Sequence, residues 1–327
     1  MYLVADIGGT NARFALAEPG PERPDISPPS IYLTADHPSM EEALRAFLDA
    51  SGRPKLSGVA ACAAGPVEGG EGDALIRMTN CPWEVSLGGL ARVTGVAAPR
   101  LMNDFAALAL SVPALRRQEL HGVGPDRAGR AGAPVAILGA GTGLGISSLV
   151  FDGAHEIPVP GEGGHADLPP ATPREMEVLA CLQAKYGHVS VERVLSGPGL
   201  VALHAALCEI DGSAAGRLTP PDIASRAQEG SDARAAEAVA LFCGWLGAVA
   251  GNLALTLGAE GGIYIGGGIV PGWIENAPGL FDEARFRARF EDKGRMSSFL
   301  ARIPVFVILR KDAALLGLAR AALARSR

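Results

Sequence analysis

The stretch VADIGGTNARFALA, residues 4 to 17, contains two apolar runs on either side of a pair of glycines. An apolar run typical of a buried strand leads to Gly8 and Gly9, and a second strand-like run follows. Glycine lets backbone N–H groups approach and wrap an anion, because a Cβ at the same place would collide with phosphate oxygens. A strand, a glycine turn and a second strand are therefore a candidate half of a phosphate clamp.

The same device recurs further along the chain. Residues 135 to 151 again contain a strand, a glycine-rich turn and a strand, and a third glycine cluster at 266 to 268 follows another strand-like run. Three such turns suggest a nucleotide bound between two related halves. Taken singly, each turn is more often an ordinary tight hairpin than a phosphate cradle, so both interpretations stay open at this point.

Other glycine motifs are excluded. A Walker loop requires Gly-Lys, a dipeptide that does not occur in this chain. The dinucleotide fingerprint fails in GAGTGLG, because counting from Gly139 and Gly141 puts Leu144 where the third glycine belongs. Protein kinases are disfavoured because none of the chain's lysines has the required V-A-I-K setting; they are Lys55, Lys185, Lys293 and Lys311.

Composition indicates a globular protein. The 327 residues are 48% hydrophobic and carry a formal net charge of −6, with basic residues scattered along the chain. Nucleic acid is therefore not an expected partner. The five cysteines form no C-x-x-C pair, which fits reduced thiols in a cytoplasm. Asp6 interrupts the first apolar run, so no secretory signal is predicted.

One segment is long and apolar enough to raise the question of a membrane span. Residues 238 to 259 carry no charge. They are diluted by alanine and glycine and by Asn252 and Thr256, and they lack flanking Lys or Arg. A buried helix is the better interpretation, and no membrane association is expected.

Strands and helices alternate along the chain, which predicts an α/β protein. Two helices carry cap signals: Ser39 with Glu42, and Thr172 with Pro173 and a capping box closed by Glu175. Residues 18 to 30 contain five prolines and predict a surface loop. Strands are expected at 1–7, 12–17, 56–65, 100–104, 135–151 with its central turn, 261–267 and 304–309, and helices at 39–50, 105–112, 172–187, 196–210, 219–230, from 235 onward and at 312–324.

Polar residues beside these elements are candidate functional groups. Asp6 could hold Mg²⁺ through its waters, or it could simply initiate the turn. Asn103 and Asp104 lie between a strand and a helix, where a helix cap is an equally good interpretation. Glu162 and His165 are three apart in a glycine-rich loop, but no third metal ligand lies nearby, so no protein metal site is predicted.

Seven segments, in order from residue 2 to about residue 320, resemble the bacterial glucokinase family of the actin/hexokinase/sugar-kinase superfamily. They are ADIGGTNARFALA, NDF, GAGTGLG, PGEGGH, VSVERVLSGPGL, GGIYIGGGIVP and FEDKGR. The branch of the superfamily with a cysteine-rich zinc loop is not resembled, because no such cluster exists here. The resemblance implies a two-domain actin-like (ribonuclease H-like) ATPase fold with mixed sheets and an interdomain cleft.

The resemblance also implies an activity, a cellular setting and domain boundaries. The implied reaction is phosphorylation of D-glucose at its 6-hydroxyl by ATP with Mg²⁺, in glycolysis and in the cytoplasm, by a homodimer. Residues 1–114 plus 305–327 would form a small α/β domain, and 115–304 a large one. Other candidates are a kinase of another hexose and a non-kinase actin-like ATPase. A sugar-sensing regulator would need an added helix-turn-helix.

Site residues follow from the same resemblance, position by position. Asp104 would be the general base that accepts the proton of the sugar's 6-hydroxyl. Glu192, otherwise a candidate for a solvated helix residue, would join the sugar ligands. The implied sugar-binding residues are Asn103, Asp104, Glu162, His165 and Glu192, and the implied nucleotide-binding residues are Asp6, Gly8, Gly9, Thr10, Thr142, Gly143, Gly266, Gly267 and Gly268.

Departures from the family pattern are few. Ala5 stands where the family often has glycine, and residues 80 to 86, NCPWEVS, are a variant of the loop over the sugar. Asn80 and Trp83 could help to close this loop, but packing in the core is an equally good interpretation of Trp83.

Overall fold

The computed structural model describes residues 1–70, 72–78, 81–153 and 155–324. The chain forms two compact units. Unit 1 comprises Met1–Arg116, Glu156–Pro160 and Arg310–Arg327, and unit 2 comprises Arg117–His155 and Gly161–Leu309.

The sheet of unit 1 is mixed. Strands β1 (Tyr2–Ile7) and β2 (Asn11–Glu18) form the antiparallel hairpin predicted around the first glycine turn. Strands β5 (Gly58–Ala63) and β8 (Arg100–Asn103) continue the sheet in parallel with β1, in the order β3-β2-β1-β5-β8. The other strands of this unit are β3 (Asp25–Ile26) and β4 (Ser30–Leu33) on β2, and the separate pair β6 (Leu75–Arg77) and β7 (Glu84–Ser86). The predicted loop 18–30 is thus mostly loop, with β3 inside it.

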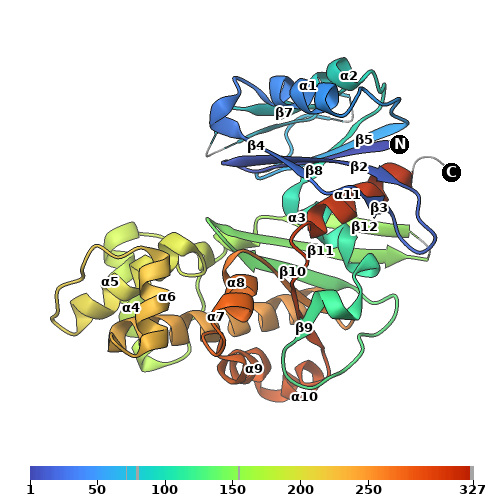
Figure 1. Ribbon diagram of the computed structural model, residues 1–327. Coiled ribbons are helices and arrows are strands. Elements are labelled where there is room, and N and C mark those ends of the chain that lie inside the picture. The colour runs from blue at the N-terminus through green and yellow to red at the C-terminus, as the bar shows by residue number, and fades with distance from the viewer. Residues whose placement is uncertain (71, 79–80, 154, 325–327) are drawn as a thin grey trace. The chain divides into compact units, whose positions relative to one another are not determined.

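Helices cover both faces of this sheet (Figure 1). Helices α1 (Met40–Ala50) and α2 (Leu87–Thr94) lie on one face, and α3 (Asp104–Ser111) and α11 (Ala313–Leu323) on the other. Short 3-10 turns are η1 (Thr34–Asp36) and η2 (Val112–Ala114). Helix α1 begins as predicted, because the Ser39 hydroxyl accepts a hydrogen bond from the backbone N–H of Glu42 at 3.3 Å.

Unit 2 repeats this strand arrangement. Strands β10 (Val135–Ala140) and β11 (Leu144–Asp152) form the second glycine hairpin, and β13 (Gly262–Gly267) and β14 (Val305–Ile308) follow in parallel with β10. The full order is β12-β11-β10-β13-β14-β9, with edge strands β9 (Leu120–Gly122) and β12 (His155–Gly161). Residues 156–160 of β12 are counted with unit 1. A hairpin followed by two parallel strands therefore occurs in both units, as expected for two related halves.

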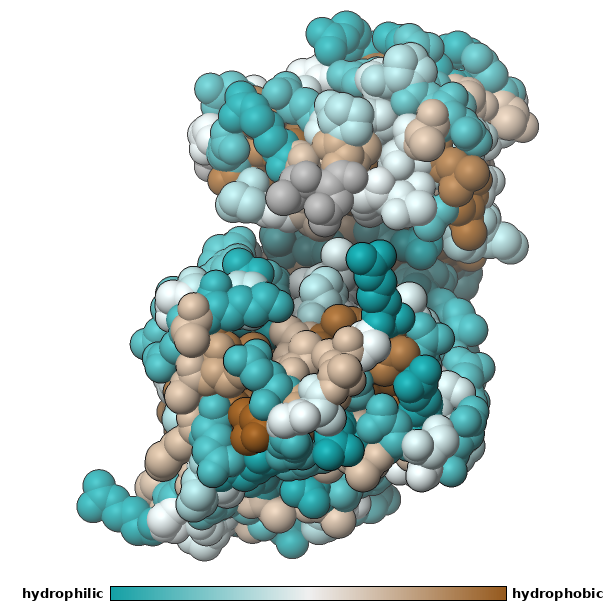
Figure 2. All heavy atoms as spheres, turned by 90° about the vertical axis from the view of Figure 1, so that its left-hand side faces the viewer, coloured by the Kyte–Doolittle hydropathy of each residue, from teal (hydrophilic) through white to brown (hydrophobic). Residues whose placement is uncertain are grey.

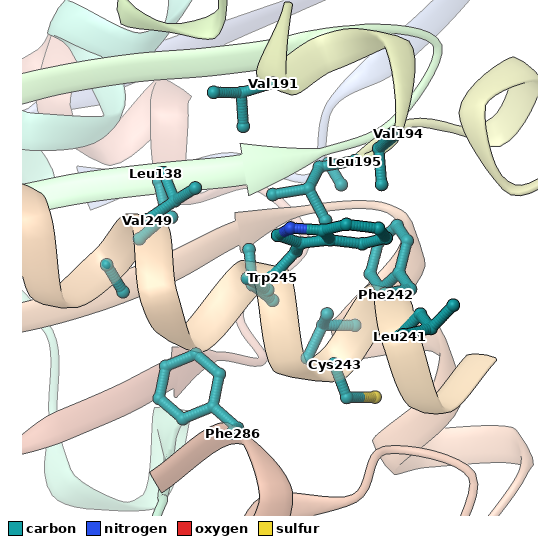
Figure 3. Packing of buried hydrophobic residues seen from close by; sticks show 14 of the residues in the cluster. Leu138, Val191, Val194, Leu195, Leu241, Phe242, Cys243, Trp245, Val249 and Phe286 are labelled. Carbon is teal, nitrogen blue, oxygen red and sulfur yellow. The ribbon is translucent and has the colours of Figure 1, made fainter. Parts of the chain in front are cut away.

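The helices of unit 2 pack around a long central helix, α7. The indole of Trp245 in α7 lies beside Phe242, with Leu195 and Val194 nearby (Figure 3). The helices are α4 (Pro173–Tyr186), α5 (Gly197–Ile210), α6 (Pro220–Glu229), α7 (Ala233–Leu257), α8 (Ile269–Asn276), α9 (Glu283–Glu291) and α10 (Ser297–Leu300), with 3-10 turns η3 (Arg117–Glu119), η4 (Gly163–His165), η5 (Val191–Arg193) and η6 (Gly294–Met296).

Helix α7 is the segment for which a membrane span had to be considered. Among the described residues it is the one helix long and apolar enough to cross a bilayer, and 78% of its most apolar window is buried inside the protein. It therefore serves as a core helix of unit 2, as predicted. The surface visible in Figure 2 is mainly hydrophilic, with apolar residues interspersed.

The predicted capping box of α4 is wrong in one of its two bonds. Thr172 caps the helix and accepts from the N–H of Glu175 at 3.2 Å. The Glu175 carboxylate, however, accepts from the N–H of Ala171 at 2.7 Å instead of reaching Thr172. Its Oε2 also pairs with Arg289 of α9 at 3.1 Å, so this buried carboxylate is held by a tertiary ion pair that the local sequence pattern does not reveal.

Buried acidic groups should make the protein sensitive to alkali. Burial raises the pKa of the Cys243 thiol from 9.0 to about 12 and also raises the pKa of the Tyr264 hydroxyl. The folded state favours the neutral thiol. The contribution of this thiol to stability is therefore fully present below its pKa in the unfolded chain, and it is lost as the pH rises from about 9 toward 12. We expect the thermal unfolding midpoint, measured by circular dichroism, to decrease when the pH is raised from 8.5 to 10.5. The decrease should be smaller in Cys243→Ala. A midpoint independent of pH in this range would contradict the expectation.

Candidate functional site

The candidate residues of unit 1 lie at the carboxyl ends of its three parallel strands. Asp6 is near the end of β1, Asn103 is the last residue of β8, and Asp104 is the first residue of α3. Cys62 of β5 stands between them, in register with Asp6 on one side and Met102 on the other. Ligands of α/β sheets bind outside the carboxyl ends of the strands, so this edge is a candidate site.

Asp6 is held by two neighbours in the sheet. Its Oδ2 is 3.2 Å from Arg13 Nη1, and its Oδ1 accepts from the Cys62 thiol at 3.5 Å. Burial, followed by the charges of Asp6 and Asp104, raises the pKa of Cys62 well above its usual value. The thiol is therefore favoured in its neutral form. The pairing of Asp6 with Arg13 could have been found from the sequence, because a tight turn at 8–10 puts these residues opposite each other.

The first glycine turn is held by two backbone hydrogen bonds and by the hydroxyl of Thr34. The N–H of Gly8 donates to the carbonyl of Asn11 at 2.9 Å. The Thr34 hydroxyl donates to the carbonyl of Gly9 at 2.8 Å, and its N–H donates to the carbonyl of Thr10 at 3.0 Å. Thr10 is exposed. Thr34 therefore supports this turn. Its role could not be predicted from the sequence, because it depends on the pairing of β4 with β2, which no local pattern indicates.

Asn103 is the N-cap of α3. Its Oδ1 accepts from the N–H groups of Phe105 at 2.9 Å and Ala106 at 3.4 Å, and its Nδ2 donates to the carbonyl of Gly65 at 3.0 Å. The cap interpretation is therefore correct for Asn103. Its side-chain amide has a second N–H group, which can donate to a ligand. Asp104 is half-buried in the first turn of α3, where its Oδ1 accepts from Phe105 N–H at 2.9 Å.

The candidate nucleotide residues of unit 2 lie at the corresponding edge of the second sheet. Gly139 of β10 is opposite Gly266 of β13, and a Cβ on Gly139 would lie 2.5 Å from the Gly266 carbonyl carbon. Gly267 has φ +77°, and a Cβ there would overlap the carbonyl oxygen of Ala140. Gly268 N–H donates to that same carbonyl at 3.0 Å. Only glycines allow the two backbones to approach this closely.

The second turn joins this edge to the candidate sugar residues. Thr142 is exposed at its tip. Glu192, in η5, accepts from the N–H of Leu144 at 2.8 Å, and a Cβ on Gly143 would overlap its Oε2. A Cβ on Gly164, in η4, would overlap the Leu144 carbonyl oxygen. The two segments η4 and η5 therefore both pack against the second turn.

Glu162 precedes η4 and His165 is its last residue, and both are exposed. The carbonyl of Glu162 accepts from the N–H of His165 at 3.0 Å. Within the described part of the chain, neither side chain makes a hydrogen bond or ion pair, so both remain available to a ligand. Among the described residues, no group of three or more histidine, cysteine, aspartate or glutamate side chains could hold a metal ion.

The loop that was expected to lie over the sugar is partly described. Asn80 lies outside the described residues. Trp83 is 3% exposed and belongs to the core of unit 1, where its Nε1 donates to the carbonyl of His37 at 3.2 Å. Packing is therefore the correct interpretation of Trp83.

Two mixed sheets with the same strand order, each with a glycine hairpin at its first parallel strand, define an actin-like ATPase fold of the kind found in sugar kinases. A family model described as Glucokinase matches residues 3–325, and the chain belongs to that family of kinases.

Individual relatives agree with this assignment. The chain is 48% identical to a glucokinase of Aromatoleum aromaticum over 98% of its own length and 93% of the relative's. It is 46% identical to a glucokinase of Chromobacterium violaceum, over 97% and 88% of the two lengths. A crystal structure of glucokinase from an Antarctic psychrotroph is 32% identical, with a TM-score of 0.88 over 99% of this chain and 98% of that one.

Proposed function

We propose that this enzyme transfers the γ-phosphoryl group of ATP to the 6-hydroxyl of glucose, with Asp104 as the general base. The glucokinase family model covers nearly the whole chain, and this carries the choice of reaction. The carboxylate of Asp104 at the carboxyl end of β8 supports the choice of base. Phosphoryl transfer needs mainly positioning and charge compensation, and a carboxylate base orients the attacking hydroxyl.

The proposed sugar ligands combine donors and acceptors. Asn103 has a second amide N–H, while Asp104, Glu162 and Glu192 are carboxylates that accept from hydroxyls. His165 offers an exposed imidazole. A site that hydrogen-bonds each hydroxyl rejects an analogue lacking one by roughly 10⁴-fold, which supports specificity for one hexose.

Backbone groups and hydroxyls would carry the proposed nucleotide site, because none of the four lysines lies in the three glycine turns. The proposed groups are Asp6, Gly8, Gly9, Thr10, Thr142, Gly143, Gly266, Gly267 and Gly268. Mg²⁺ takes one or two carboxylates plus substrate phosphates, so a single residue such as Asp6 fits it without a cluster of protein ligands. When bound, the ion supplies positive charge that compensates the phosphate oxygens. Preorganised N–H donors at the turns compensate charge in the same way.

We also propose the cellular setting on the strength of family membership. The enzyme would act in the cytoplasm, in glycolysis, and as a homodimer. The expected domains, 1–114 plus 305–327 and 115–304, are proposed with one adjustment: residues 305–309 are counted with the large domain, because β14 (Val305–Ile308) pairs with β13 of unit 2. Reduced cysteines support the compartment, since all five are free thiols.

A coupled assay tests the reaction. ATP with Mg²⁺ is offered with glucose, mannose, fructose or N-acetylglucosamine separately, and ADP release is followed together with sugar phosphate. Glucose should be phosphorylated at the highest kcat/KM. Phosphorylation of none of the four would contradict a hexose kinase, and a strong preference for another hexose would contradict glucose as the substrate.

A further inference from the structure

The second glycine turn, residues 141–144, is hydrogen-bonded at both of its ends to one other segment of the chain, residues 192–197. The carboxylate of Glu192 accepts from the N–H of Leu144 at 2.8 Å. Gly197, five residues later, donates its N–H to the carbonyl of Gly141 at 2.8 Å. Residues 192–197 therefore clamp the turn on either side of Thr142 and Gly143.

The Glu192 carboxylate packs so closely against Gly143 that only glycine fits at this position without displacing the carboxylate. A Cβ on Gly143 would overlap Oε2 of Glu192, whereas the same atom on Gly141 would have its nearest neighbour, the nitrogen of Gly268, at 3.9 Å. The position of the Glu192 carboxylate and the shape of the turn are thus linked at Gly143. The half-buried Glu192 is also fixed through its backbone, because its carbonyl accepts from the Ser196 hydroxyl at 2.8 Å.

The bond to Leu144 uses one of the two carboxylate oxygens of Glu192. A carboxylate accepts at about four lone-pair positions, so Oε1 remains able to accept from a sugar hydroxyl while Oε2 holds the turn. A hydroxyl on Oε1 would fix the side-chain torsion that directs Oε2 at Leu144.

We infer that Glu192 is a positioning residue for the phosphate turn as well as a sugar ligand, and that it couples glucose binding to nucleotide binding. This inference rests on the proposed function. Hydrogen bonds to charged groups contribute about 1.5–3 kcal/mol, which corresponds to roughly 10- to 150-fold in affinity. Coupling between the two ligands must be reciprocal, so each tightens the other by the same factor.

Calorimetric titration of the full-length enzyme with AMPPNP and Mg²⁺, in the absence of glucose, tests the positioning role. Glu192→Ala should weaken AMPPNP binding by about tenfold or more. Glu192→Gln, which keeps an oxygen acceptor for Leu144, should stay within about threefold of wild type. His165→Ala is the matched control, because it removes a neighbouring sugar ligand without touching the turn. His165→Ala should weaken the binding of glucose and leave the affinity for AMPPNP unchanged.

A pair of glycine variants tests the coupling from the other side. Gly143→Ala forces the Glu192 carboxylate to move and should raise the Kd for glucose, measured without nucleotide, by about tenfold. Gly141→Ala adds the same methyl group to the same turn where there is room, and should leave the Kd for glucose within about twofold. This pair also decides the question if Glu192→Ala does not fold.

Unchanged AMPPNP affinity in a folded Glu192→Ala, or equal glucose affinity in the two glycine variants, would overturn the inference. Either result can occur while the wild-type enzyme still binds and phosphorylates glucose, in which case the proposed function stands. Failure of the wild-type enzyme to bind glucose or AMPPNP would instead overturn the proposed function.

Discussion

Asp104→Asn should lower kcat for glucose phosphorylation by roughly 10²- to 10⁴-fold, the usual contribution of a general base. The amide cannot take the proton of the 6-hydroxyl, but it keeps an oxygen that can accept from the N–H of Phe105, now 2.9 Å from the carboxylate. The first turn of α3 should therefore persist. Because the group acts mainly in the transition state, kcat should fall much more than KM for glucose rises.

The matched control for this prediction is Asp49→Asn in α1 of the same unit. Its side chain is 58% exposed and pairs with Arg53 on the surface, so turnover should stay near wild type. Steady-state kinetics, with circular dichroism to verify folding, give the comparison. Turnover of Asp104→Asn within a few-fold of wild type would remove this residue from the role of base.

Gly317→Ala should strongly destabilise unit 1. In the contact between α11 and α3, a Cβ on Gly317 would overlap the carbonyl oxygen of Ala107 and lie 2.8 Å from its carbonyl carbon. Because the obstacle is backbone, the helices must separate, which costs about 3 kcal/mol or lowers the unfolding midpoint by roughly 6–12 °C. Since α3 begins at Asp104, kcat should fall as well.

Gly88→Ala in α2 is the control for this effect. Nothing lies within 4 Å of a Cβ there, and alanine is the better helix former by about 1 kcal/mol. Calorimetry should therefore find Gly88→Ala at or above wild-type stability. Equal stability of the Gly317 and Gly88 variants would contradict the close packing of α11 on α3.

The two hairpins and most of the helices could be predicted because their signals are local. Residues 4–17 contain both strands and the turn of the first hairpin, and the register of a tight turn then follows. The caps Ser39 and Thr172 lie within three residues of the groups they bond. The central strands β1, β2, β5, β8, β10, β11, β13 and β14 were predicted on this local basis, whereas the edge strands β9 and β12 and the helices α2 and α8 were not.

Contacts between distant residues could not be predicted in this way. Glu192 reaches Leu144 across 48 positions, and Glu175 reaches Arg289 across 114. Both bonds depend on the packing of whole elements, which no local pattern encodes. Residue type alone likewise did not decide whether Trp83 covers a ligand or packs in the core.

Helix α9 was not predicted, for a different reason: its own sequence gives only a weak helical pattern. Residues 283–291, EARFRARFE, alternate charged and apolar side chains without a strong helical stripe, and the helix was missed. Its apolar residues Phe286 and Phe290 are fully buried, and carbonyls of this helix lie where Cβ atoms of Gly247 and Gly251 in α7 would be. Tertiary packing on small residues therefore stabilises a helix that its own sequence indicates only weakly.

The most direct test of the proposed reaction is a crystal structure of the enzyme with glucose and AMPPNP bound. We expect the 6-hydroxyl oxygen of glucose to lie within about 2.6–3.2 Å of the Asp104 carboxylate and to face the γ-phosphorus. A bound glucose whose 6-hydroxyl contacts other groups, with Asp104 directed away from it, would show that Asp104 is not the general base.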